Sequence, residues 1–182
     1  YYGNSQGGIL GHAYFALSPH FERGVLGVSG APYSVLLPRS VDFDQYFRIF
    51  QTMYPDYMDI SLWMGLMQTL WDPSEPTAYL DAIFQNPLPN TPTKQVLLQV
   101  AVGDTQVTTL GAHIQARGIG AKLLAPSARN IWGLETMQSG EVGSAIVEWD
   151  YGLEEPFESI PPDGDDPHSR PRNDVAGQEQ LH

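Results

Sequence analysis

The segment from Gln95 to Val102, "QVLLQVAV", constrains the possible fold more than any other part of the chain. It is apolar almost throughout, and it lacks the strict alternation of a strand that has one face in water. Such a run, closed by the turn residues "GD", predicts a strand that is buried on both faces of a parallel sheet. The 182 residues, of which 42% are hydrophobic, are enough for one domain with a sizeable core.

Other segments repeat this character and alternate with helical patterns. "GVLGVSG" (Gly24 to Gly30) is a short apolar run bounded by glycines, and "SAIVEWDYG" (Ser144 to Gly152) is rich in β-branched and aromatic residues. Apolar residues at helical spacing occupy "GGILGHAYFALSP", and a second helix is expected from about Val107 to Arg117. Apolar strands that alternate with helices predict an α/β fold, with a mostly parallel sheet flanked by helices.

Residues 32–94 are too many for a simple crossover, and we expect them to form a helical insertion. Aromatic residues recur at spacings of three and four in the first part, "DISLWMGLMQTLW" (59–71) is apolar around much of a helix, and "EPTAYLDAIF" (75–84) suggests a third helix. Two interpretations remain: ordinary helix packing, or a cap of Met and aromatic side chains over an active site that accepts an apolar substrate.

These patterns divide the chain into three parts. Residues 1–31 would supply the first part of the core, residues 32–94 the helical cap, and residues 95–182 the rest of the core with its functional loops.

Composition excludes several classes of function. A net charge of −12 argues against binding to nucleic acid or to an anionic membrane, and no apolar run is long enough to predict a membrane span. The chain has no cysteine, so it has no disulfide, thiolate metal site or cysteine nucleophile. "DFD" and "DGDD" lack the ligand spacing of a calcium loop, and no nucleotide-binding glycine motif is present. We therefore expect neither a metal nor a cofactor, and the sequence assigns no compartment.

The chain begins with "YYGNSQGG", in which Ser5 is the centre of a G-x-S-x-G pattern. We expect Gly3 and Gly7 to permit a sharp turn from a strand to a helix, and Gly8 to let that helix pack close to the sheet. The predicted helix follows directly, as this kind of turn requires. The pattern alone is weak, but in this context it makes Ser5 a candidate nucleophile.

A serine nucleophile needs a general base, and His168 is the best candidate. It lies in a loop after the last predicted strand, from which it could reach the carboxyl edge of the sheet. His12 is seven residues beyond Ser5 on the same predicted helix, about 10 Å away and too far for a hydrogen bond. The remaining histidines are at the end of that helix, within a crossover helix or at the last position: His20, His113 and His182.

The base in turn needs a carboxylate, and Asp104 follows the apolar strand directly. This position places it at the sheet edge where sites form in open α/β folds. An aspartate before "TQV" is also typical of a turn or a helix cap, and that alternative remains. Three competitors lie in an acidic loop close to His168 and are expected to be solvated charges: Asp163, Asp165 and Asp166.

Ser5 in "GNSQGG", Asp104 in "VAVGDTQV" and His168 in "DDPHSRPR" thus follow the order serine, acid, histidine, each after a strand. This order resembles the α/β-hydrolase superfamily, and the resemblance covers nearly the whole chain as the C-terminal half of such an enzyme. It implies a carboxylesterase or lipase-like serine hydrolase that acts on apolar acyl esters. Ser5 would attack the ester carbonyl, His168 would take its proton, Asp104 would orient His168, and the backbone N–H of Gln6 would stabilise the oxyanion.

Other functions are compatible with the same residues. Peptide, lactone or polyester cleavage would use the same catalytic groups, and a non-catalytic fragment or subunit could keep the fold and act as a binding partner. The resemblance also implies that early strands and a second oxyanion donor lie outside this sequence. We therefore expect an upstream segment or a second copy to complete the sheet.

Overall fold

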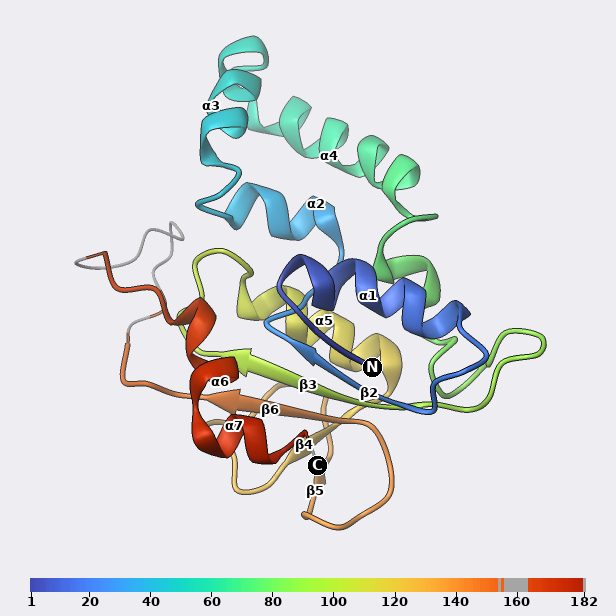
Figure 1. The fold of residues 1–182 in the computed structure, drawn as a ribbon. Coiled ribbons are helices and arrows are strands. Elements are labelled where there is room, and N and C mark those ends of the chain that lie inside the picture. The colour runs from blue at the N-terminus through green and yellow to red at the C-terminus, as the bar shows by residue number, and fades with distance from the viewer. Residues whose placement is uncertain (154, 156–163, 182) are drawn as a thin grey trace.

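The computed structural model describes residues 1–153, 155 and 164–181, and these form an α/β fold around one parallel sheet (Figure 1). The predicted fold class is confirmed. The six strands are arranged in the order β1-β2-β3-β6-β4-β5, with every pair parallel. The strands are β1 (Tyr2–Asn4), β2 (Arg23–Gly27), β3 (Gln95–Ala101), β4 (Lys122–Leu124), β5 (Thr136–Met137) and β6 (Ala145–Trp149).

Helices cover both faces of this sheet. The helices are α1 (Gln6–Leu17), α2 (Tyr33–Leu36), α3 (Asp44–Met53), α4 (Tyr57–Trp71), α5 (Thr109–Ile119), α6 (Arg170–Asn173) and α7 (Val175–Glu179). In Figure 1, α1 and α5 lie on one face, α6 and α7 lie on the other, and α3 and α4 form a layer beyond α2. Short 3₁₀ helices are η1 (Leu37–Arg39), η2 (Pro76–Tyr79) and η4 (Pro167–Ser169).

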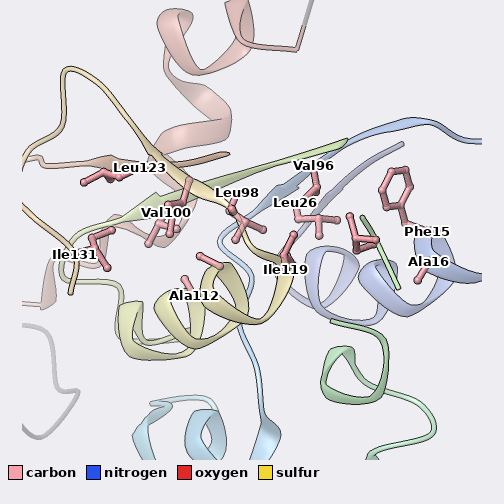
Figure 2. Close-up of a cluster of buried hydrophobic side chains, with 14 of the residues drawn as sticks. Phe15, Ala16, Leu26, Val96, Leu98, Val100, Ala112, Ile119, Leu123 and Ile131 are labelled. Atoms are coloured by element: carbon pink, nitrogen blue, oxygen red, sulfur yellow. The ribbon is translucent and has the colours of Figure 1, made fainter. Parts of the chain in front are cut away.

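Strand β3 lies at the centre of the sheet, between β2 and β6, and this position explains why its sequence is so apolar. Val96, Leu98 and Val100 lie in the main core cluster, which side chains of α1 and α5 complete (Figure 2). The polar Gln99 is also fully buried, and its Nε2 donates to the backbone oxygen of Gly177 at 2.8 Å, beside α6 and α7. Each fully buried large apolar side chain contributes about 1.5–3 kcal/mol to the stability of the fold.

The predicted strands at residues 95–102 and 144–152 are present as β3 and β6, and the helix expected at residues 107–117 is α5. The strand expected over residues 24–30 ends earlier, at Gly27. The amide of Val28 makes the last ladder bond, to the oxygen of Gln99 at 2.7 Å, but Val28 itself adopts φ 44°. This left-handed conformation is incompatible with continued strand pairing.

Residues 32–94 contain α3 over the recurring aromatics and α4 over the apolar segment, as predicted. The expected helix over residues 75–84 is wrong, because only the short η2 forms there. The side chain of Glu75 accepts the amide of Thr77, and the amide of Ala82 donates three residues back to Tyr79, which is a 3₁₀ pattern that ends quickly.

Helix α4 is apolar but buries only Ile60 and Met64 among its 15 residues. Within the ranges given above, no helix has both the length and the apolar character that crossing a membrane requires.

Candidate active site

Ser5 occupies the turn between β1 and α1, at the carboxyl end of the strand. Its backbone has φ 55° and ψ −126°, a region that only glycine adopts readily. The amide of Ser5 donates to the oxygen of Gly27 at 2.9 Å, and the oxygen of Ser5 accepts from Ile9 at 2.9 Å. The turn is therefore fixed by β2 on one side and by the first turn of α1 on the other.

The glycines around this turn have different roles. A Cβ on Gly3 would collide with the backbone oxygen of Gly7, and a Cβ on Gly8 would lie 2.8 Å from the oxygen of Gly27 and 2.9 Å from the Cβ of Ser29. A Cβ on Gly7 would meet nothing within 4 Å, so no steric contact requires glycine at that position. The backbone approaches closely at positions 3 and 8, and glycine at these positions permits that approach.

Asp104 follows β3 and is 6% exposed. Its Oδ1 accepts the amides of Gln106 at 2.9 Å and Val107 at 2.8 Å, while Oδ2 lies 2.8 Å from Nδ1 of His168. The turn role and the role as partner of a histidine are thus combined in one carboxylate. Burial raises the pKa of Asp104, and the hydrogen bonds from His168 and from the amide of Val107 oppose that rise.

His168 lies on η4 and is 3% exposed. Its Nε2 is 2.9 Å from Oγ of Ser5, so the imidazole lies between Ser5 and Asp104. An ionised carboxylate only accepts, so Nδ1–H donates to Asp104 and Nε2 is left to accept the hydroxyl of Ser5. The structure therefore brings together three residues that are far apart in sequence, in a serine–histidine–carboxylate arrangement.

His12 and His113 are bound to other partners. His12 is fully buried in α1, where Nε2 lies 3.2 Å from the oxygen of Tyr79 and Nδ1 lies 3.0 Å from Nε2 of Gln115. Burial lowers the pKa of His12 to about 4. His113 is packed against Glu148, 2.7 Å away. His182 lies outside the described residues.

A cavity of about 140 Å³ opens beside Ser5. Buried apolar residues and aromatic rings form much of its wall, with polar groups at a few points. Gln6 begins α1, where backbone N–H groups have no acceptor within the helix, and its side chain donates to the hydroxyl of Tyr33 at 2.7 Å. The lining residues are Ser5, Gln6, Ile9, Tyr33, Leu36, Leu37, Ser40, Asp42, Phe43, Gln106 and Val107.

A second charged cluster lies between β6, α5 and the following loops, and sequence reasoning missed it. Glu148 of β6 is bound by Nε of Arg129 at 2.7 Å and by His113 at 2.7 Å. Burial would raise the pKa of Glu148, but these hydrogen bonds outweigh it and lower the pKa to about 2. Arg129 also binds Glu155, with Nη2 and Oε1 3.0 Å apart. A glutamate within the apolar run "SAIVEW" was the available signal, because buried carboxylates are normally paired.

The acidic residues near His168 differ from one another. Asp166 is only partly exposed and bonds to Gln106 and to the amide of His168, so the expectation that it is a solvated charge is wrong. Asp165 is exposed and pairs with Arg170 at 2.7 Å. Asp163 lies outside the described residues.

Across the part of the chain that the structure describes, no three His, Asp or Glu side chains converge in a way that could hold a metal ion. Comparisons with protein-family models, curated proteins and solved structures give no match.

Proposed function

We propose that the chain is a serine hydrolase of the α/β-hydrolase type that cleaves carboxylic esters through an acyl-enzyme. The single observation that carries this proposal is the pair of hydrogen-bond distances at His168, 2.9 Å to Oγ of Ser5 and 2.8 Å to Oδ2 of Asp104. A serine hydroxyl is a weak nucleophile unless a base removes its proton, and this arrangement supplies both the base and its orienting carboxylate.

In the proposed reaction, Oγ of Ser5 attacks the ester carbonyl while Nε2 of His168 takes the hydroxyl proton. Asp104 holds the Nδ1–H tautomer and stabilises the imidazolium. The proton then passes from His168 to the leaving alkoxide as the C–O bond of the ester breaks. His168 then takes a proton from a water molecule, whose oxygen attacks the carbonyl carbon of the acyl-Ser5 ester. The bond between this carbon and Oγ breaks, the proton passes from His168 to Oγ, and the carboxylic acid leaves.

The negative charge on the carbonyl oxygen needs hydrogen-bond donors that are in place before the reaction. We assign the backbone N–H of Gln6 to this role, because it directly follows the nucleophile at the beginning of α1. The N-terminal end of a helix also favours negative charge.

The cavity beside Ser5 supports an ester with a small apolar group. Its volume of about 140 Å³ lies below the roughly 300–1,000 Å³ of pockets that hold drug-sized ligands. Ile9, Leu36 and Val107 form a buried apolar cluster in its wall. We propose that residues 32–94 act as the cap, because Leu36, Leu37 and Phe43 complete this wall.

Hydrolysis of p-nitrophenyl esters from acetate to dodecanoate tests the proposal. We expect measurable turnover with the short acyl esters, a decline with the long ones, and a loss of at least about 1,000-fold in kcat for Ser5→Ala. Ser29→Ala is the matched control, since Ser29 is buried outside the cavity. Turnover that persists in Ser5→Ala would refute the assignment.

The edge of the sheet favours a second role that is compatible with the first. β1 has only three residues, stands at the end of the strand order, and pairs with β2 alone among the described strands. An open strand edge is a template for pairing. We propose that a strand from another segment or a second copy of the chain pairs there; a non-catalytic assembly subunit would keep this property but fail the ester test. Native mass spectrometry that finds only a monomer would contradict the pairing between two copies.

A further inference from the structure

We propose that Asp166 is a positioning residue that fastens the loop of His168 to the loop of Asp104. The inference rests on the proposed function, since it concerns how the base reaches the nucleophile. Asp166 does not act on the imidazole ring directly; it acts through the backbone amide of His168 and through the side chain of Gln106.

The carboxylate of Asp166 contacts both loops. Oδ1 accepts the amide of His168 at 3.0 Å and lies 3.5 Å from the amide of Thr105. Oδ2 accepts Nε2 of Gln106 at 2.9 Å. One side chain thus connects segments that are about 60 positions apart in the sequence.

Gln106 completes a closed ring of hydrogen bonds. Its backbone amide donates to Oδ1 of Asp104 at 2.9 Å, while its side chain donates to Asp166. The ring runs from Asp104 through Gln106 and Asp166 to the amide of His168, and the bond from Nδ1 of His168 to Asp104 closes it. Because each member holds the next, the imidazole has little freedom to leave Ser5.

Charge strengthens this ring. Burial would raise the pKa of Asp166, but hydrogen bonds from Gln106 and from the amides of His168 and Thr105 outweigh it and lower the pKa. Bonds to an ionised acceptor are shorter and roughly twice as strong as neutral ones. Its neighbour Asp165 pairs with Arg170 at the surface, within the segment of His168, and makes no hydrogen bond to residues 104–107, so it provides a matched comparison.

The test measures kcat and KM of the full chain on a p-nitrophenyl ester for three variants. We expect Asp166→Ala to lower kcat by about 10- to 100-fold with KM within about twofold, because displacing a catalytic group by about 1 Å costs on that order. Asp166→Asn keeps an acceptor for the amide of His168 and can pair with a flipped Gln106 amide, so it should recover most of the lost kcat. Asp165→Ala should leave both constants unchanged.

Each other outcome is decisive. Full activity in Asp166→Ala would overturn this inference and leave the proposed function intact. A loss of kcat that follows a loss of the helical circular dichroism signal would assign Asp166 to folding and also overturn it. Equal losses of kcat in Asp165→Ala and Asp166→Ala would show a general effect of removing a negative charge and would also overturn the inference. Absence of turnover in the wild-type chain would instead contradict the proposed function itself.

Discussion

At the residue scale, Ser5 combines a conformational cost with a half-buried hydroxyl group that we propose as the nucleophile. Its φ of 55° costs a non-glycine residue about 1–3 kcal/mol, and the surrounding hydrogen bonds must offset that cost. The turn holds Oγ within 2.9 Å of His168, whereas a relaxed turn would not fix its direction. Strain at this position is therefore expected to serve the chemistry.

We predict that an alanine substitution lowers the free energy of unfolding at Gly8 but not at Gly7, which serves as the control. Gly8→Ala should lower the free energy of unfolding by about 1–3 kcal/mol, because its Cβ would lie 2.8 Å from the oxygen of Gly27 and force α1 away from β2. Gly7→Ala, one residue earlier and free of contacts within 4 Å, should leave stability unchanged or raise it by up to about 1 kcal/mol. Urea unfolding of both variants measures the difference. Equal destabilisation by the two substitutions would contradict this view of the turn.

At the scale of elements, α1 carries Ser5 at its first turn and is anchored by His12 further along. His12 links α1 to η2 through the oxygen of Tyr79 and to α5 through Gln115. The neutral ring suits both contacts, with Nε2–H donating and Nδ1 accepting. The anchor therefore depends on pH.

The pKa of His12 predicts how stability changes with acid. It is about 4 in the folded chain and 6.5 in the unfolded chain, so the unfolded state binds the proton more tightly. Stability from this group is complete above pH 6.5 and is lost progressively as the pH falls toward 4, about 2 kcal/mol between pH 7 and pH 5. Urea unfolding at the two pH values should show this loss in the wild type and a smaller one in His12→Gln. Equal losses in both proteins would refute the assignment.

The elements differ in how well the sequence predicted them. β3 and β6 are continuous apolar runs, and their burial between two helical layers follows from that pattern. β4 and β5 have three and two residues, too few for any periodicity. β4 pairs with β6, and β5 pairs with β4, so both depend on the sheet that is already formed. The prediction of a third helix over residues 75–84 was wrong because a 3₁₀ helix begins after Glu75, at Pro76.

At the scale of the whole molecule, the positions of residues directly after predicted strands indicated the site, because parallel strands have their carboxyl ends at the same edge of the sheet. That principle placed Ser5, Asp104 and His168 near one another before any contact was known. It could not show the bonds of Asp166 or of Arg129, since these join loops whose mutual orientation depends on the completed fold.

The central claim is that Ser5 is an activated nucleophile, and labelling with a fluorophosphonate probe tests it most directly. We predict one adduct per chain by intact mass, located on Ser5 by peptide mapping, absent in Ser5→Ala and strongly slowed in His168→Ala, with Ser29→Ala labelled like the wild type. No adduct on the folded wild-type chain, or an adduct that persists in Ser5→Ala, would contradict the account.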